Sequence, residues 1–431
     1  QTRFFRQAID HGNVVRTEQA ERSEHGLIDP STPWSGLLKH ETIPFVSYPF
    51  EWSFGMLQDA ALLYLDLLTA ALDESFTLKD GTAYNVQWVG TRPVLIDVVS
   101  FERLAAGQAW TGYRQFCQTF LYPLLLQAYK HIPFQPWLRG CLDGISPQDC
   151  WSLMSYRDFF RRGVPSHVFL HKWLQSRREL DERDSKQALS TAGFNTEVIR
   201  HNVRGLQRLV RGLRWTPPES TWSDYAETNR YSSDDRDRKE CFVRSVVQSR
   251  RWKLVWDVGC NTGQFARIAA ENSEQVVAID ADPPTIERLY QSLKSQSDAR
   301  HTPILPLVND LVDLPGGLGW RGRERQALFD RGKPELTLCL ALVHHLVIGR
   351  GVPLRDLLDW FAELGTSLVI EFVAKEDPQV QRLLHGRRDN DSDYDPLVFE
   401  RLLSERFEVI RSESLGSGTR RLYFAQARST S

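Results

Sequence analysis

Residues 254–266 read LVWDVGCNTGQFA, and this stretch decides the fold of the C-terminal half of the chain. A short apolar run ends at Asp257, a turn containing Gly259 and Gly263 follows, and a helix is expected near Gln264. Glycine is needed where a backbone turns sharply or must approach a ligand closely. The pattern therefore predicts a strand, a glycine turn and a helix that border a ligand site.

Two further short strands are expected to end in polar residues. The strand at 276–279 ends in Asp280, about twenty residues after Gly259, where an acid can accept both hydroxyls of an adenosine ribose. The strand at 304–308 ends in Asn309 and Asp310. Ligands of α/β sheets bind at the carboxyl ends of the strands, so this edge is where we expect the site.

The turn reads D-x-G-x-N-x-G and resembles motif I of class I S-adenosylmethionine-dependent methyltransferases. The resemblance covers roughly 200 residues and implies a Rossmann-like α/β sheet of seven strands that ends in an antiparallel hairpin. The later strands are expected at 336–342, followed by His344 and His345, at 367–370, followed by Glu371, and at 407–410 and 421–425.

The same resemblance implies S-adenosyl-L-methionine as cofactor and S-adenosyl-L-homocysteine as product. It implies that Asp257 binds the methionine amino group, that Asp280 binds the ribose hydroxyls, and that Asp310 binds the adenine amino group. The other residues that it places at the cofactor are Gly259, Asn261 (often glycine in the family), Gly263, Phe265, Asn309 and Tyr231.

The methyl acceptor is less constrained by the sequence. The segment 341–344 lacks the (Asn/Asp)-Pro-Pro-(Tyr/Phe) motif, whose presence would resemble the amino methyltransferases. His344 or His345 can take a hydroxyl proton near neutral pH, with Glu371 as an alternative base or anchor. We therefore expect transfer to a hydroxyl, carboxyl or similar nucleophile of a specialised small molecule, as in natural-product biosynthesis. Two alternatives remain: methylation of RNA or protein through the basic 157–215 surface, and a non-catalytic module that binds the cofactor.

Residues 76–102 carry a second resemblance. Asp80 and Asn85 have the D-x4-N spacing of a kinase catalytic loop, and Asp97 follows an apolar run where a metal-binding Asp would stand. This resembles the catalytic lobe of the aminoglycoside-phosphotransferase and protein-kinase-like fold. Leu78 replaces the usual His, and no glycine-rich loop precedes it, so we expect a degenerate, mainly helical α+β domain without kinase activity. Its role would be a scaffold or acceptor pocket, with Asp80, Asn85, Asp97 and Tyr225 as candidate substrate contacts.

Together, the two segments resemble a bacterial group of class I methyltransferases, some labelled nodulation-type. The expected organisation is an arm at 1–45, the kinase-like domain at 46–215, a linker at 216–221 and the methyltransferase domain at 222–431.

Composition places bounds on the remaining properties of the 431-residue chain. A net charge of -2 gives no reason to expect a nucleic-acid or membrane partner, although 157–215 holds 13 Lys or Arg against 6 Asp or Glu. None of the six cysteines has metal-ligand spacing, so we expect free thiols and no metal ion. No run of 18 apolar residues occurs, and we expect no leader and a cytoplasmic protein.

Overall fold

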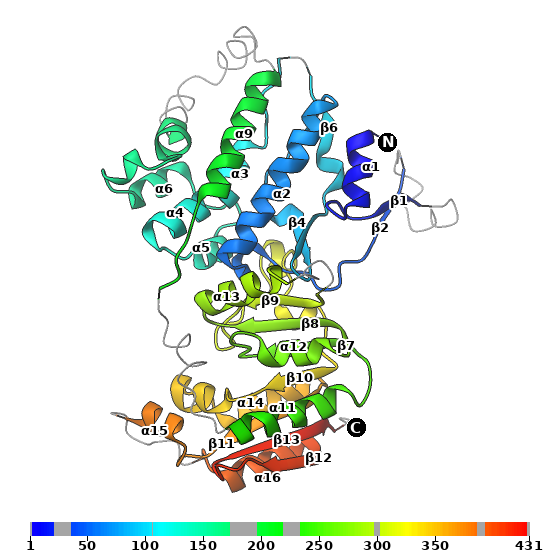
Figure 1. Ribbon diagram of the computed structural model, residues 1–431, viewed down its shortest axis with the longest axis vertical. Coiled ribbons are helices and arrows are strands. Elements are labelled where there is room, and N and C mark those ends of the chain that lie inside the picture. Colours follow the sequence, from blue (N-terminus) through cyan, green and yellow to red (C-terminus); the bar gives the residue numbers. More distant parts are fainter. Residues whose placement is uncertain are drawn as a thin grey trace. The chain divides into compact units, whose positions relative to one another are not determined.

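The computed structural model of the chain divides into two compact units, Gln1–Thr216 and Pro217–Ser431 (Figure 1). The structure describes residues 2–20, 36–105, 107–172, 196–218, 233–296, 302–385 and 393–428. Each unit is considered separately below.

The N-terminal unit is built around the long helix α2, Phe54–Asp73. The hydroxyl of Ser53 caps it by accepting from the backbone of Met56. By length and composition α2 could cross a membrane, but 67% of its most apolar window is buried inside the unit, as expected of a core helix. Helix α9, Thr196–Gly212, packs along α2, and the Gln207 amide donates to Asp66 at 2.7 Å.

Short elements surround these two helices. Two antiparallel strand pairs, β3 with β6 and β4 with β5, follow α2 in the chain, and β1 pairs with β2. The remaining bounds are α1 Arg3–Asp10, β1 Thr17–Gln19, β2 Leu38–His40, β3 Phe76–Leu78, β4 Val86–Val89, β5 Arg92–Leu95, β6 Phe101–Arg103, α3 Tyr113–Phe116, α4 Tyr122–Lys130, α5 Gln135–Gly140 and α6 Pro147–Leu153. The unit is therefore mainly helical with little sheet, which is the α+β character that the sequence predicts.

The C-terminal unit contains the predicted seven-stranded sheet. Its strand order is β12-β13-β11-β10-β7-β8-β9 (Figure 1). Strands β7, β8, β9, β10 and β11 are parallel to one another. Strand β13 pairs antiparallel with β11 and forms the terminal hairpin with β12. The strands are β7 Trp252–Val258, β8 Ser273–Asp280, β9 Ile304–Val308, β10 Leu336–Cys339, β11 Ser367–Val373, β12 Phe407–Ser414 and β13 Arg420–Ala427. All five residues of β9 are buried, as are the last four of β7, which is the pattern of strands covered on both faces.

Helices connect these strands and cover the sheet. They are α11 Ser233–Val247, α12 Gln264–Ala270, α13 Pro283–Lys294, α14 Leu354–Glu363, α15 Pro378–Leu384 and α16 Pro396–Arg406. Helix α11 packs on α12, and α14 packs on α16. One apolar cluster joins α11, α12 and α13 to the central strands, through residues such as Phe242, Val255 and Leu289.

Two strand ends differ from the prediction. Strand β10 stops at Cys339 instead of 342, because Ala341 adopts a left-handed conformation with φ 52° and turns the chain. Strand β11 continues to Val373, so Glu371 lies inside the strand, opposite Leu422 of β13, and does not follow its end. Both differences change which side chains reach the edge of the sheet.

Candidate functional site

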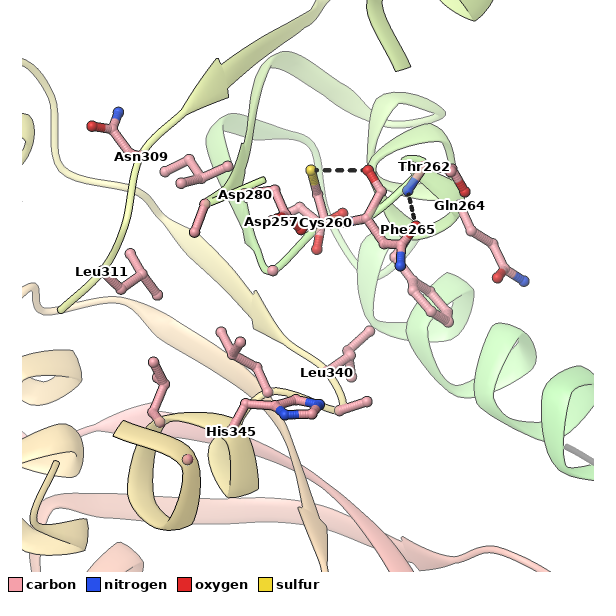
Figure 2. Close-up of a pocket in the computed structure, with 18 of the residues that line it drawn as sticks. Asp257, Cys260, Thr262, Gln264, Phe265, Asp280, Asn309, Leu311, Leu340 and His345 are labelled. Carbon is pink, nitrogen blue, oxygen red and sulfur yellow. Dashed lines mark hydrogen bonds between the residues drawn. The ribbon is translucent and has the colours of Figure 1, made fainter. Parts of the chain in front are cut away.

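A cavity of about 590 Å³ opens at the carboxyl ends of β7, β8, β9 and β10 (Figure 2). The described residues that line it belong to the C-terminal unit. They include the predicted Asp257, Gly259, Asn261, Phe265, Asp280, Asn309, Asp310 and His345. The volume is in the range of sites for small molecules and cofactors.

The turn between β7 and α12 forms one wall of this cavity. Gly259, Asn261 and Gly263 all have positive φ, at 73°, 48° and 80°. A Cβ added to Gly263 would approach Leu289 Cδ1 to 2.5 Å, and one at Gly259 would lie 3.0 Å from Leu342 Cδ1. Gly263 does not itself line the cavity but allows the turn that does. The sequence prediction of a tight glycine turn is therefore confirmed by the backbone.

The carboxylate of Asp257 lies in the wall of the cavity. The side chain is 2% exposed, and the backbone N–H of Ala266 donates to it. Within the described part of the chain, no donor reaches Oδ2. Burial raises the pKa of Asp257 to about 7, an effect that the ammonium of Lys239 partly offsets. A buried acceptor of this kind is costly unless a ligand supplies a donor.

Asp280 is held at the end of β8 by backbone donors. Its Oδ2 accepts from Asn261 N and its Oδ1 from Asp282 N, both at 3.0 Å. Burial raises its pKa to about 6 against the effect of these hydrogen bonds. The backbone of Ala281 also donates to this carboxylate, which can accept about four hydrogen bonds, so acceptor capacity remains for a hydroxyl group of a ligand.

Asn309 and Asp310 follow β9 and also line the cavity. The backbone of Asn309 donates to Asp280 O at 2.9 Å, which fixes the ends of β8 and β9 together. Asp310 already has two partners, because its Oδ1 accepts from Val312 N and its Oδ2 pairs with Arg350 at 2.9 Å. If Asp310 binds a ligand as predicted, its carboxylate would contact both the ligand and Arg350.

The two adjacent histidines have different surroundings. His345 lines the cavity, at the start of a π-helical turn, His345–Gly349. His344 is fully buried and does not line it, and within the described residues neither of its ring nitrogens has a hydrogen-bond partner. The ring centroids are 4.1 Å apart. Burial lowers the pKa of His345 to about 4 and that of His344 well below its usual value. Both rings are therefore neutral at pH 7.

Glu371 does not line the cavity. It is fully buried in the middle of β11 and forms ion pairs with Lys239 at 2.5 Å and Arg420 at 3.3 Å. Although burial alone would raise it, these two cations hold the pKa of Glu371 below its ordinary value. The carboxylate is therefore charged and engaged by two cations, which suits an anchor better than a proton acceptor.

Three basic residues of the cavity wall were not foreseen from the sequence: Arg236 and Lys239 on α11, and Arg350 after the π-helical turn. Charged residues on a helix are ordinarily read as a solvent-exposed face, so their pattern gives no signal. The position of α11 beside the glycine turn could have been inferred only from the family fold.

The remaining predicted residues lie elsewhere. Asp80, Asn85 and Asp97 are in the N-terminal unit, where the Asn85 amide donates to Asp97 Oδ2 at 3.0 Å. Tyr225 and Tyr231 lie outside the described residues. In the parts of the chain that the structure describes, no group of three His, Cys, Asp or Glu could hold a metal ion.

Strand order, glycine turn and strand-end acids together define the C-terminal unit as a class I S-adenosylmethionine-dependent methyltransferase domain. The chain is 35% identical over 423 residues to nodulation protein NoeA of Rhizobium meliloti (strain 1021), which covers 98% of this chain and 88% of that protein. It belongs to the same family as that protein. No protein-family model matches the chain.

Solved structures resemble part of the chain. The N-methyltransferase NodS from Bradyrhizobium japonicum WM9 is 15% identical, with 46% of this chain and 99% of that one covered and a TM-score of 0.34. The magnesium protoporphyrin IX methyltransferase from Synechocystis PCC 6803 with bound S-adenosylhomocysteine is 17% identical, with 48% and 92% covered and a TM-score of 0.34. Similarity at this level does not identify a substrate.

Proposed function

We propose that the protein binds S-adenosyl-L-methionine in the cavity and transfers its methyl group to a hydroxyl, carboxyl or similar nucleophile of a specialised small molecule. The observation that carries the proposal is the Asp257 carboxylate, which is buried in the cavity wall with its Oδ2 lacking a protein donor among the described residues. The ammonium group of the cofactor would supply that donor.

The other residues of the wall fit the remaining parts of the cofactor. Asp280 retains acceptor capacity for the ribose hydroxyls, because its bonds to backbone N–H groups leave part of that capacity unused. Asn309 and Asp310 lie at the neighbouring strand end for the adenine. Gly259 carries no side chain at the point where the backbone must approach the ligand.

The cofactor, when bound, supplies an electrophilic methyl group on its sulfonium. Positioning of the acceptor then contributes most of the rate, and a base is needed only when the acceptor carries a proton. His345 is the candidate base, because it faces the cavity as a neutral imidazole with one nitrogen able to take a proton. His344 supports it from behind through ring contact, and Glu371 anchors Lys239.

For the N-terminal unit we propose a kinase-like scaffold without phosphotransfer. Its support is the chain order: β3, Asp80, Asn85, β4, β5, Asp97 and β6, with β3 paired to β6 and β4 to β5. The hydrogen bond from Asn85 to Asp97 joins two of the residues that the resemblance singles out. Leu78 in place of the usual His argues against catalysis by this unit.

Methylation of RNA or protein through the basic surface is less favoured. Arg200 pairs with Asp73 at 3.3 Å and Arg211 with Asp66 at 3.2 Å, so two arginines of α9 attach this helix to α2. The six cysteines are free, in keeping with a reducing compartment, and we infer a cytoplasmic location from this.

Calorimetric titration with S-adenosylmethionine and S-adenosylhomocysteine tests the first half of the proposal. We expect binding by the wild type, and a loss of tenfold or more in Asp280→Ala, about the value of hydrogen bonds to a charged group. Asp330→Ala is the matched control, because Asp330 is exposed and does not line the cavity. No binding by the wild type, or equal binding by the Asp280 and Asp330 variants, would contradict it.

A further inference from the structure

Two aromatic side chains of the N-terminal unit lie almost entirely in water. Tyr156 is 92% exposed and Phe160 is 87% exposed, and both belong to the segment 155–172, which follows helix α6 in the chain (Figure 1). Phe169 and Leu170 of the same segment are 40% and 45% exposed. Single exposed apolar residues are ordinary on a protein surface, but several large ones in one segment indicate a surface that binds a partner.

Ring contacts join the exposed aromatic side chains to a partly buried layer beneath them. The ring centroids of Phe160 and Phe159 lie 5.7 Å apart, and those of Phe159 and Phe169 lie 5.5 Å apart. The ring of Trp151, on α6, lies 5.2 Å from Phe169 and 6.3 Å from Phe159. Trp151 and Phe159 are partly buried, so they support the two rings that face the solvent. Phe160 and Phe169 therefore belong to one continuous apolar surface.

A buried carboxylate holds the turn at 155–161, which carries both of the most exposed rings. Asp158 is 2% exposed and accepts from Ser155 N at 2.8 Å and from Ser155 Oγ at 2.7 Å. Lys130 Nζ donates to the same carboxylate at 2.9 Å, and Arg161 Nε pairs with it at 3.0 Å. These contacts fix the backbone of the turn before a partner binds, so its two rings are presented with little ordering left to lose.

Positive charge accompanies the exposed rings. Arg157 and Arg162 are exposed, and no carboxylate in the described part of the chain pairs with either of them. Lys172 Nζ lies 5.5 Å from the centre of the Trp151 ring. The segment 155–172 holds four Lys or Arg against one Asp or Glu, although the net charge of the whole chain is only -2. The surface is therefore both apolar and locally basic.

Aromatic rings among cations fit the surface of an anionic bilayer. Tyrosine and other large aromatic side chains are favoured at the boundary between hydrocarbon and water, and arginine is attracted by the negative charge of the headgroups. Single-stranded nucleic acid also offers phosphates and stacking, but its binding requires cations that follow the backbone. Arg157 and Arg162 are two cations in one turn rather than such a row, and Leu170 adds apolar area on which a base cannot stack. The bilayer is therefore the better match.

We propose that the segment 155–172 is a peripheral membrane-binding surface whose partner is a bilayer that contains anionic phospholipids. Tyr156 and Phe160 enter the interfacial region of the bilayer, while Arg157 and Arg162 contact the lipid phosphates. The inference goes beyond the proposed function, because it concerns the N-terminal unit and requires no cofactor. It gives that unit a role of its own, which is to bring the protein to a membrane surface.

Co-sedimentation of the full-length protein with lipid vesicles tests the inference. Two kinds of vesicle are compared: phosphatidylcholine alone, and phosphatidylcholine mixed with phosphatidylglycerol. We expect the wild type to bind the mixed vesicles at least about tenfold more tightly, because each arginine near the headgroups adds a favourable interaction with anionic lipid. Added salt should reduce this difference, since it screens the charges.

The aromatic rings and the arginines are then tested separately. Tyr156→Ser combined with Phe160→Ser should weaken binding to both kinds of vesicle by at least about tenfold, because it removes the apolar area that enters the bilayer. Arg157→Gln combined with Arg162→Gln should bring the affinities for the two kinds of vesicle within about threefold of each other. All four side chains are exposed, so both variants should keep the wild-type circular dichroism spectrum and melting temperature.

Matched controls carry the same kinds of substitution elsewhere in the N-terminal unit. Val99→Ser removes an apolar side chain that is 66% exposed, and Arg204→Gln combined with Arg208→Gln removes two exposed cations of α9. These controls should bind both kinds of vesicle within about twofold of the wild type. None of the substituted residues lines the cavity, so S-adenosylhomocysteine binding measured by calorimetry should be the same in every variant.

Three results would overturn the inference. The first is a wild type that binds neither kind of vesicle, or binds both equally. The second is an equal loss of vesicle binding in the controls, which would assign the effect to apolar area and charge in general. The third is binding of polyuridine that disappears when Arg157 and Arg162 are replaced, without binding of vesicles, which would assign the surface to nucleic acid. A wild type that binds vesicles but not S-adenosylhomocysteine would instead contradict the proposed function and leave this inference standing.

Discussion

Arg350 Nη2 lies 2.9 Å from Asp310 Oδ2, and both residues line the cavity. The pair joins the end of β9 to the segment after the π-helical turn. Arg350 is 51% exposed and Asp310 32%, so the ion pair is partly screened by water. Pairs of this kind contribute about 0–1 kcal/mol, and Asp310 can accept a further hydrogen bond from a ligand at little expense.

Asp310 and Arg350 should therefore differ in their effect on cofactor binding. Asp310→Asn should weaken S-adenosylhomocysteine binding by about tenfold, because it removes the charged acceptor proposed for the adenine amino group. Arg350→Gln should change the affinity by less than about fivefold. Calorimetry on both variants checks this, and a larger effect of Arg350→Gln would instead place that guanidinium at the ligand.

Gly263→Ala should destabilise the C-terminal unit. The residue has φ 80°, and an added Cβ would approach Leu289 Cδ1 to 2.5 Å. A left-handed non-glycine residue alone costs about 1–2 kcal/mol, and the contact adds to this. Urea unfolding monitored by circular dichroism gives the free energy of unfolding.

The control for Gly263→Ala is Gly205→Ala in helix α9. There, an added Cβ meets no atom within 4 Å, and alanine is preferred over glycine in helices by about 0.5–1 kcal/mol. The two substitutions should thus shift stability in opposite directions. If Gly263→Ala has the same free energy of unfolding as the wild type, the prediction is wrong, and the turn between β7 and α12 can adjust to the added methyl group.

Cofactor binding should depend on pH through Asp257. Its folded pKa of about 7 is raised by burial, and an ammonium ligand requires the ionised form. As pH falls below about 7, a proton occupies the acceptor, so S-adenosylhomocysteine affinity should fall by up to about tenfold per pH unit. Titrations at pH 8, 7 and 6 measure this dependence.

Two further measurements isolate Asp257 from Asp280, whose pKa of about 6 lies in the same window. Asp257→Asn should bind weakly, with the steeper part of the pH dependence between 8 and 6.5 removed. The same variant should gain stability relative to the wild type as pH rises from 4 to 7, because a carboxyl with a raised pKa destabilises the fold when it ionises. A wild-type affinity that does not change with pH would contradict the assignment of the ammonium to Asp257.

His345 should remain neutral well below the pH at which histidine ordinarily titrates. Burial is the main cause of its lowered pKa of about 4, and the charge of Arg420 adds to it. Protonation therefore favours unfolding, and the stability associated with the neutral ring should decline as pH falls from about 6.5 towards 4. NMR of ¹⁵N-labelled histidine, compared with His345→Gln to assign the signal, measures the ring state. A cationic His345 at pH 6 would remove it as the candidate base.

Local patterns in the sequence were sufficient for the sheet and for the turn at Gly259 and Gly263. The prediction succeeds there because apolar β-branched runs, the spacing of the glycines and the acids at strand ends are all patterns among residues that are close in the sequence. The position of Glu371 was not predictable in the same way, since its strand continues only because β13 pairs with it as far as Arg420. Burial of Lys239 depends on how α11 packs, which no local pattern encodes.

The histidine pair illustrates the same limit. The sequence offers His344 and His345 as alternative bases but does not say which one faces the ligand. The left-handed Ala341 and the π-helical turn decide the matter by directing His345 to the cavity. A π-helical turn has no dependable sequence pattern and is frequent at functional sites.

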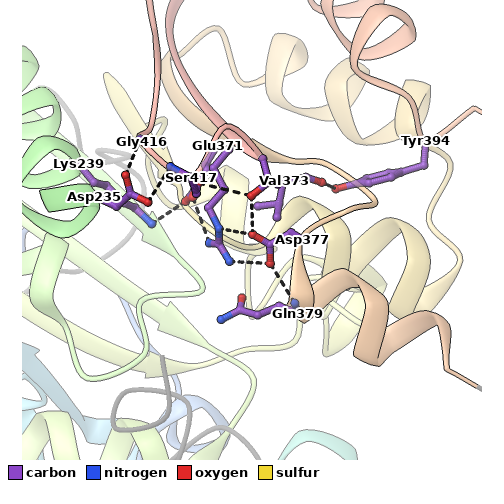
Figure 3. Close-up of polar contacts among 11 residues, drawn as sticks. Asp235, Lys239, Glu371, Val373, Asp377, Gln379, Tyr394, Gly416 and Ser417 are labelled. Carbon is purple, nitrogen blue, oxygen red and sulfur yellow. Dashed lines mark hydrogen bonds and ion pairs between the residues drawn. The ribbon is translucent and has the colours of Figure 1, made fainter. Parts of the chain in front are cut away.

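Asp377 serves two elements at once. It caps α15 by accepting from Gln379 N at 2.9 Å (Figure 3), and it accepts hydrogen bonds from Nε and Nη2 of Arg420. Leu383 of the same helix lines the cavity. Removing one partner of a buried ion pair lowers the free energy of unfolding by about 3–5 kcal/mol. Displacement of α15 would therefore be opposed by the ion pairs that Arg420 forms with Asp377 and Glu371. The wall of the pocket that Leu383 lines is thereby tied to β13 through Asp377 and Arg420 before any ligand arrives.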